Sequence, residues 1–167
     1  MPILKEGEIN LITHSAEQTY RLGVRFGTLL RAGDVICLSG DMGAGKTVFS
    51  AGIGVGWGAV EALTSPTFNL VHEHRRERDD QKLFHIDCYR LKNADEVETI
   101  GFDDILNARG VVILEWPELI LAALPKQHLW IELRVTEPTR RIMSFITHGE
   151  HYRVLLNDYI GQTSQTS

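Results

Sequence analysis

The sequence predicts an α/β fold, a three-layer sandwich with a mostly parallel central sheet and an antiparallel hairpin or edge strands. Two uninterrupted apolar runs, Val35–Ser39 and Val111–Leu114, are typical of strands buried on both faces of a parallel sheet. Ser15–Arg31, which precedes the first run, carries apolar residues at helical spacing. A glycine-rich loop, Gly40–Thr47, follows the same run directly and leads into a second helical segment.

The first two elements follow from patterning and capping. Glu8–Thr13 mixes apolar with polar residues, which predicts a short strand at a sheet edge. Ser15 is followed three residues later by Gln18, a capping-box pattern that marks the start of the helix Ser15–Arg31.

A second helix is expected from Lys46 to about Ala59. Its glycines weaken its helix propensity, but small residues would let it pack closely on the sheet. These glycines are Gly52, Gly54, Gly56 and Gly58.

The second half of the chain predicts a hairpin, a short helix, a buried strand, a further helix, two strands and a final helix. In order, these are Leu70–Glu73 with Leu83–Asp87, Glu96–Leu106, Val111–Leu114, Pro117–Leu124, Leu129–Val135, Arg141–Thr147 and Tyr152–Tyr159. Pro117 suits the first position of a helix because proline has no backbone N–H to leave unpaired there. The charged stretch His74–Lys82 would form the hairpin loop.

Length and composition fit one soluble domain. The 167 residues contain no repeat and no interior linker, so residues 1–161 are expected to form a single domain. The polar stretch Gln162–Ser167 predicts a disordered tail. Cys37 and Cys88 lie in apolar strand-like segments and are interpreted as buried free thiols of a reducing compartment.

Several classes are disfavoured by the same features. No apolar run approaches the roughly 20 residues of a membrane span. The N-terminus shows no secretory signal pattern, so the expected location is cytoplasmic and without a membrane. A net charge of −5 argues against sequence-independent binding of nucleic acid by the isolated chain.

The loop Gly40–Thr47 reads Gly-Asp-Met-Gly-Ala-Gly-Lys-Thr and matches the phosphate-binding pattern G-x-x-x-x-G-K-[ST] in full. Glycines let the backbone wrap an anion with its N–H groups inward, at the positive end of a helix dipole. Lys46 would bring charge to the outer phosphates, and the Thr47 hydroxyl would enter a Mg²⁺ shell. The expected nucleotide contacts from this segment are Asp41, Met42, Gly43, Ala44, Gly45, Lys46, Thr47 and Val48. The domain is therefore predicted to be a P-loop NTPase domain.

Two carboxylates should lie near the metal, because ligands of open α/β sheets bind at the carboxyl ends of strands. Glu115 closes the apolar run Val111–Leu114, as the acid of a Walker B segment does. Asp87 closes the apolar stretch that begins at Leu83.

Four segments together resemble the TsaE (formerly YjeE) family of P-loop ATPases, which act in bacterial synthesis of threonylcarbamoyladenosine in tRNA. They are Gly40–Thr47, Ser65-Pro66-Thr67-Phe68, His85-Ile86-Asp87-Cys88-Tyr89-Arg90 and Glu115-Trp116-Pro117-Glu118. Their order and spacing cover nearly the whole chain. The P-loop is shared with many families, whereas the other three segments together are specific.

The resemblance implies catalytic roles for Lys46, Asp87 and Glu115. Thr47 and Glu115 would hold Mg²⁺, and Lys46 would hold the β- and γ-phosphates of ATP. Asp87 would stand near the attacking water, either as general base or as an orienting group. The sequence shows no evident arginine finger, and Arg90 is a candidate for one within the chain.

Further nucleotide contacts are implied by the same resemblance. Thr67 would lie near the γ-phosphate in a switch-like loop, and Trp116 would lie beside the nucleotide. Thr13, Ser15 and Thr19 would lie near the adenine.

The resemblance also implies ATP and Mg²⁺ as cofactors and weak hydrolysis by the chain alone. The TsaB–TsaD heterodimer would be the activating partner, and tRNA would be reached only through that complex. The pair Arg140-Arg141 is a candidate for contact with a partner or with RNA. His72, His74 and His85 lie on or near the hairpin, and alternation with surface placement explains them about as well as metal binding does.

Three alternative functions stay open. A small-molecule kinase would use the same cradle, with the charged loop His74–Lys82 as a closing lid. A GTP-dependent switch is disfavoured because the sequence has no Asn-Lys-x-Asp. A nucleotide-dependent binding module that does not hydrolyse ATP is the third.

Overall fold

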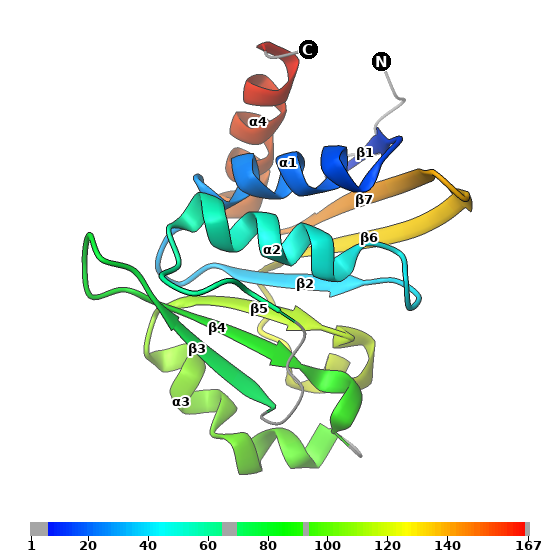
Figure 1. The fold of residues 1–167 in the computed structure, drawn as a ribbon. Helices are drawn as coiled ribbons and strands as arrows, with labels where there is room; N and C mark the ends of the chain where they lie inside the picture. Colours follow the sequence, from blue (N-terminus) through cyan, green and yellow to red (C-terminus); the bar gives the residue numbers. More distant parts are fainter. Residues whose placement is uncertain (1–6, 65–69, 92–93, 166–167) are drawn as a thin grey trace.

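The structure, a computed structural model, describes residues 7–64, 70–91 and 94–165. Within these residues, seven strands form one sheet (Figure 1). The strands are β1 (Glu8–Thr13), β2 (Val35–Ser39), β3 (Val71–Arg75), β4 (Lys82–Asp87), β5 (Val111–Glu115), β6 (His128–Glu137) and β7 (Arg140–His148).

The sheet has the strand order β1-β7-β6-β2-β5-β4-β3. The four central strands run parallel, since β2 pairs in parallel with β5 and β6, and β4 pairs in parallel with β5. The outer pairs β6–β7, β1–β7 and β3–β4 are antiparallel. The predicted fold class, a mostly parallel sheet with an antiparallel hairpin and edge strands, is confirmed.

Helices cover the sheet from two sides (Figure 1). The α-helices are α1 (Ala16–Gly27), α2 (Lys46–Trp57), α3 (Phe102–Asn107) and α4 (Glu150–Gln165). The 3₁₀ helices are η1 (Cys88–Arg90), η2 (Ala94–Ile100) and η3 (Pro117–Ala123). Helices α1, α2 and α4 lie on one face, and α3 and the 3₁₀ segments lie on the other.

Successive side chains of the buried strands lie alternately in the two apolar cores, one on each face of the sheet. Ile36 and Leu38 of β2 belong to the cluster under α1, α2 and α4, whereas Val35 and Cys37 belong to the cluster under α3. A strand that is apolar on both faces can be buried on both, which explains the central place of β2. Both cysteines are free and buried, as predicted, and burial raises the pKa of each thiol.

The first helix begins where the capping pattern predicted. The Ser15 hydroxyl accepts a hydrogen bond from the Gln18 backbone N–H at 3.1 Å, and the Gln18 side chain accepts from the His14 N–H at 2.6 Å. The helix ends at Gly27 rather than at Arg31, because the residues after Gly27 form turn bonds to Phe26 and Gly27.

The glycines of α2 contact a different partner from the one expected. A Cβ on Gly52 or Gly56 would overlap backbone carbonyls of α1, and a Cβ on Gly23 or Gly27 would overlap carbonyls of α2. The expectation that the α2 glycines allow close packing on the sheet was therefore wrong for Gly52 and Gly56. They allow two helix backbones to touch.

Three later elements differ in detail from the predictions. Glu96–Leu106 is not one helix, because Gly101 has a φ of +71° and separates η2 from α3. Pro117 begins a 3₁₀ helix that is kinked at Ile120. Helix α4 continues to Gln165, beyond the start at Gln162 of the predicted tail.

No helix in the described part of the chain has both the length and the apolar character that crossing a membrane requires.

Candidate functional site

The P-loop connects the carboxyl end of β2 to the first turn of α2. Gly40, Gly43 and Gly45 have φ values of +140°, +80° and +107°, which side-chain-bearing residues rarely adopt. A Cβ on Gly40 would overlap the carbonyl oxygen of Leu133, so β6 lies directly against the loop. A Cβ on Gly43 would meet nothing within 4 Å in the part of the chain that the structure describes, so the middle of the loop has open space there.

Lys46 lies on the inner side of this loop and is buried. Its Nζ donates a hydrogen bond to the carbonyl of Gly40 and lies 3.5 Å from the ring centroid of Trp116. Burial lowers the pKa of Lys46, while the Glu115 and Glu118 carboxylates oppose that change. The ammonium is therefore held between the loop backbone and an aromatic face.

A pocket of about 540 Å³ opens beside the loop. It is lined by Met42, Gly43, Gly45, Lys46, Thr47, Val48, Asp87, Tyr89, Arg90, Glu115 and Trp116. Three segments that are distant in the sequence thus converge, namely the P-loop, the end of β4 with η1, and the end of β5.

Asp87 and Glu115 lie side by side at the carboxyl ends of β4 and β5, where they are register partners. The Asp87 carboxylate accepts a hydrogen bond from the backbone N–H of Tyr89 at 3.0 Å. Glu115 is buried, and its Oε2 lies 2.7 Å from Nε2 of His85. The two acids therefore share one pocket but are held in different ways.

His85 has a contact that the sequence interpretation missed. It is fully buried and contacts Glu115, so surface placement does not explain it. The signal was present, because His85 is two residues before Asp87 on the same strand. Alternate residues of a strand lie on one face, so the ring lies on the face that carries both acids.

Trp116 adopts a left-handed backbone conformation with a φ of +59°. This conformation is uncommon for a bulky residue and is a feature of functional sites. It brings the ring against Lys46 on one side and to 5.0 Å, centroid to centroid, from the ring of Tyr89.

The residues expected near the adenine lie outside the lining of this pocket. Thr13 and Thr19 share a buried hydrogen bond of 2.8 Å, and Ser15 caps α1. A Cβ on Gly45 would lie 3.6 Å from the Cγ2 of Thr19, so the first turn of α1 adjoins the P-loop.

Three other residues that were expected to contact the nucleotide do not line the pocket as described. Ala44 is fully buried in the core, and Asp41 is exposed, with its carbonyl accepting from the Ala44 N–H at 3.1 Å. Thr67 belongs to a segment outside the described residues.

Two arginines reach the loop region. Arg90 lines the pocket. Arg141 donates from Nη2 to the Gly43 carbonyl at 3.5 Å and from Nη1 to carbonyls of its own hairpin turn. Arg141 thus contacts its own chain.

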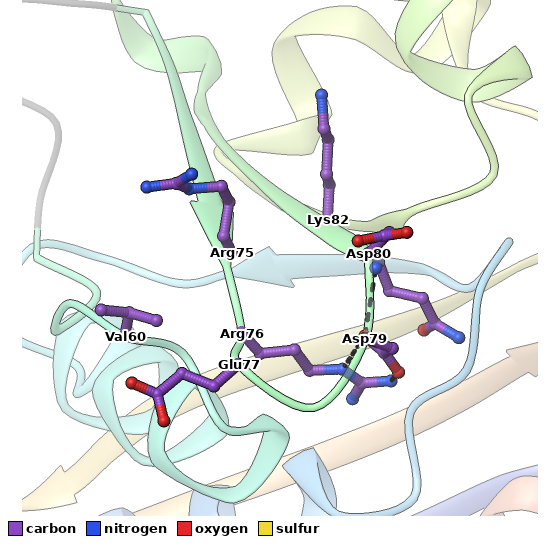
Figure 2. A pocket seen from close by; sticks show the side chains of 8 residues that line it. Val60, Arg75, Arg76, Glu77, Asp79, Asp80 and Lys82 are labelled. Carbon is purple, nitrogen blue, oxygen red and sulfur yellow. Dashed lines mark hydrogen bonds and ion pairs between the residues drawn. The ribbon is translucent and has the colours of Figure 1, made fainter.

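A second pocket, of about 530 Å³, lies at the tip of the β3–β4 hairpin (Figure 2). Its one buried arginine, Arg76, is already paired. Figure 2 shows its guanidinium reaching Asp79. The two bonds to the Asp79 carboxylate are 2.7 and 2.6 Å long, and Nη1 of Arg76 donates to the Trp57 carbonyl at 3.2 Å.

The position of this hairpin corrects one expectation. The tip precedes β4, whereas Asp87 and the P-loop lie at the carboxyl ends of the parallel strands (Figure 1). The stretch His74–Lys82, whose ends belong to β3 and β4 rather than to the loop, is therefore at the opposite end of the sheet from the P-loop. It cannot be the lid of a kinase that uses this cradle.

Comparison with known proteins gives a consistent answer. A family model described as "Threonylcarbamoyl adenosine biosynthesis protein TsaE" matches residues 13–143. The crystal structure of YdiB from Bacillus subtilis has a TM-score of 0.75 and 27% sequence identity, covering 98% of this chain and 99% of that one.

Three relatives carry the name tRNA threonylcarbamoyladenosine biosynthesis protein TsaE. The protein from Bacillus subtilis is 33% identical over 146 residues, or 87% of this chain and 90% of the relative. The one from Treponema pallidum is 37% identical over 124 residues, covering 74% and 90%. The one from Streptomyces coelicolor is 41% identical over 113 residues, covering 67% and 76%.

Proposed function

The chain belongs to the TsaE family of tRNA threonylcarbamoyladenosine biosynthesis, and we propose that in this pathway it binds and slowly hydrolyses ATP with Mg²⁺. One observation carries the proposal. A complete P-loop and two strand-end carboxylates, Asp87 and Glu115, open onto one pocket. That combination is typical of sites that bind nucleoside triphosphates with a metal ion.

The residues present fit both a triphosphate and Mg²⁺. The open space at Gly43 leaves room for an anion against the loop backbone. Thr47 and Glu115 line the pocket and supply a hydroxyl and a carboxylate, the oxygen donors that Mg²⁺ accepts alongside substrate phosphates. When bound, Mg²⁺ would neutralise charge on the β- and γ-phosphate oxygens.

The chain's own groups supply positioning and charge. Lys46 would bring its ammonium to the outer phosphates, leaving its present contact with the Gly40 carbonyl. Asp87 would orient the attacking water, because its carboxylate lies at the pocket wall on a backbone anchor. Phosphoryl transfer depends mostly on such positioning and electrostatic stabilisation.

We further propose that hydrolysis by the isolated chain is weak and that the TsaB–TsaD heterodimer activates it. An added or repositioned positive charge raises the hydrolysis rate of P-loop enzymes about 10³–10⁵-fold, and a partner can provide it. Arg90, which lines the pocket, is the residue of this chain that such a partner would reposition. Contact with tRNA would then be indirect, through the complex.

The test is phosphate release from ATP, measured with Mg²⁺ in the presence and absence of TsaB–TsaD, together with tRNA modification. We expect the partner to raise the rate. Lys46→Ala should abolish both activities, and Asp87→Asn should lose phosphate release while keeping nucleotide binding. Equal rates with and without the partner would contradict activation.

Two further outcomes separate this proposal from the alternatives. Normal tRNA modification by Asp87→Asn and Glu115→Gln, with unchanged phosphate release, would favour a binding module that needs no hydrolysis. Appearance of a phosphorylated small product in place of free phosphate would favour a kinase.

A further inference from the structure

We propose that His85 is a positioning residue that fixes the Glu115 carboxylate so that its remaining oxygen can bind Mg²⁺. This inference rests on the proposed function above. It assigns a role to a buried histidine that surface placement does not explain.

The contact joins two neighbouring parallel strands. His85 of β4 pairs in register with Ile113, and Glu115 follows two residues later on β5, on the same face. The Nε2–Oε2 distance of 2.7 Å is that of a strong hydrogen bond. A carboxylate can only accept, so the proton of this bond is on Nε2 of His85.

Among the described residues, one oxygen of Glu115 has a hydrogen-bond partner, which is His85. Oε2 accepts from His85, and the residue lines the pocket beside Lys46 and Thr47. Hydrogen bonds to ligating carboxylates fix their orientation, which is a common arrangement around protein-bound metals. The Asp87 carboxylate accepts from a backbone amide instead, so among the described residues His85 is the side chain that holds one of the two acids.

The surroundings of the ring argue against a role in packing alone. His85 is fully buried, and none of its surface is accessible. Among the described residues, its Nδ1 is buried without a hydrogen-bond partner. An apolar side chain would fill this place without an unpaired nitrogen, so the useful contact of His85 is the one to Glu115.

Two substitutions at His85 distinguish loss of the Nε2 hydrogen-bond donor from loss of the imidazole ring. In His85→Gln, the amide nitrogen can occupy the place of Nε2 and donate to Glu115. In His85→Asn, the amide is too short and falls near Nδ1. His74→Asn is the matched control, because His74 is also buried, has an unpartnered Nε2 among the described residues, and does not contact Glu115.

The measurement is calorimetric binding of ATPγS to the full chain, in EDTA and over a Mg²⁺ titration. For His85→Asn we expect unchanged affinity in EDTA and a Mg²⁺ requirement raised about 10–100-fold. His85→Gln should restore most of the Mg²⁺ response, and His74→Asn should match the wild type. A purely structural role of His85 would lower stability without separating these two affinities.

Three results would overturn the inference: a wild-type Mg²⁺ response in His85→Asn, an equal loss in His85→Gln and His85→Asn, or an equal loss in His74→Asn. Absence of any ATPγS binding by the wild type would instead overturn the proposed function itself. Binding with an intact Mg²⁺ response in every variant would leave that function standing.

A measurement on the wild type covers the case in which His85→Asn does not fold. With ¹⁵N-labelled histidine, the Nε2 proton of His85 should give a protected resonance that shifts when Mg²⁺ is added to the ATPγS complex. The His74 resonances should not shift. An unshifted His85 resonance would overturn the inference.

Discussion

At Lys46, burial and nearby charge act in opposite directions. Removal from water disfavours the ammonium and lowers its pKa, and this is the larger effect. Carboxylates on several sides oppose it, Glu115 most strongly and then Glu118. The Trp116 ring adds attraction from its face, worth about 0.5–2 kcal/mol for such a pair. Two of the groups that maintain the charge needed for phosphate binding, Glu115 and Trp116, line the same pocket as Lys46.

The pH dependence of nucleotide binding should report this balance. We expect affinity for ATP in EDTA to fall as pH rises toward 10.5, because Lys46 loses its proton below its ordinary pKa. Glu115→Gln removes the strongest opposing charge, so the fall should occur at lower pH. Fluorescence titration with a labelled nucleotide measures it, and Glu150→Gln, on an exposed helix start, is the control. An identical pH profile in Glu115→Gln would show that Glu115 does not sustain the charge of Lys46.

Trp116 should report occupancy of the pocket. Its ring touches Lys46 at 3.5 Å, so a nucleotide that draws the ammonium toward its phosphates must change the surroundings of the indole. We expect the intrinsic fluorescence of the wild type to change on adding ATP and that of Trp116→Phe to stay constant. Trp130→Phe is the control, since Trp130 packs on the α3 side of the sheet. A full response in Trp116→Phe would refute this assignment.

At the scale of elements, the helix pair α1–α2 sets the position of the P-loop. Gly23 and Gly27 on α1 meet Gly52 and Gly56 on α2, each spaced four residues apart, so the backbones approach within contact. The same approach places Thr19 of α1 beside the P-loop. The glycines cost helix propensity, about 1 kcal/mol each, and the close packing of the two helices offsets it.

Adding one methyl group at this contact should therefore destabilise the protein. A Cβ on Gly56 would overlap the Val24 carbonyl, which is backbone and cannot rotate away. We expect Gly56→Ala to lower the free energy of unfolding by about 1–3 kcal/mol, measured by urea denaturation. Gly161→Ala is the control, because Gly161 lies in α4 and no described residue comes within 4 Å of its Cβ position. There alanine should be neutral or stabilise by up to about 1 kcal/mol, and equal effects at both sites would contradict the packing argument.

Local chemistry made some elements predictable and left others undetermined. The P-loop follows from a motif in one segment, and the acids Asp87 and Glu115 follow from the ends of apolar strands, so all three could be located. The partner of the α2 glycines depends on which helix lies beside which, and periodicity does not specify that. The contact between His85 and Glu115 depends on β4 pairing with β5, and the break at Gly101 depends on a positive φ that a helical pattern does not reveal.

At the scale of the whole molecule, different ionisable residues lie at the two ends of the sheet. The P-loop end holds Lys46 and its carboxylates. The opposite end, where β6 begins, holds a pair of stacked histidines, His128 and His148, with ring centroids 4.4 Å apart. His128 is buried there, and its Nδ1 lies 2.9 Å from the Pro125 carbonyl. The histidines that limit the stability of the protein at acid pH should therefore lie far from the pocket.

The sign of that pH dependence follows from the pKa shifts. Burial is the main cause that lowers the pKa of His128, and His148 adds to it; burial and His85 likewise lower the pKa of His74. Below the ordinary value of 6.5, the unfolded chain consequently binds more protons than the folded one. The stability is fully present above 6.5 and is lost as pH falls toward the lower folded pKa values, with a slope of at most about 1.4 kcal/mol per pH unit for each histidine.

Urea unfolding of the wild type and of His128→Gln, followed from about pH 7.5 to about pH 5, should show this. We expect the free energy of unfolding of the wild type to decrease below 6.5 and the decrease to be smaller in His128→Gln. His14→Gln is the control, because His14 is an exposed histidine. A slope that persists in His128→Gln and disappears in His74→Asn would place the acid-sensitive group on the face of β3 instead. In that case the histidine whose protonation destabilises the fold would lie near His85 and Glu115. The region of the pocket, rather than the opposite end of the sheet, would then limit stability at acid pH.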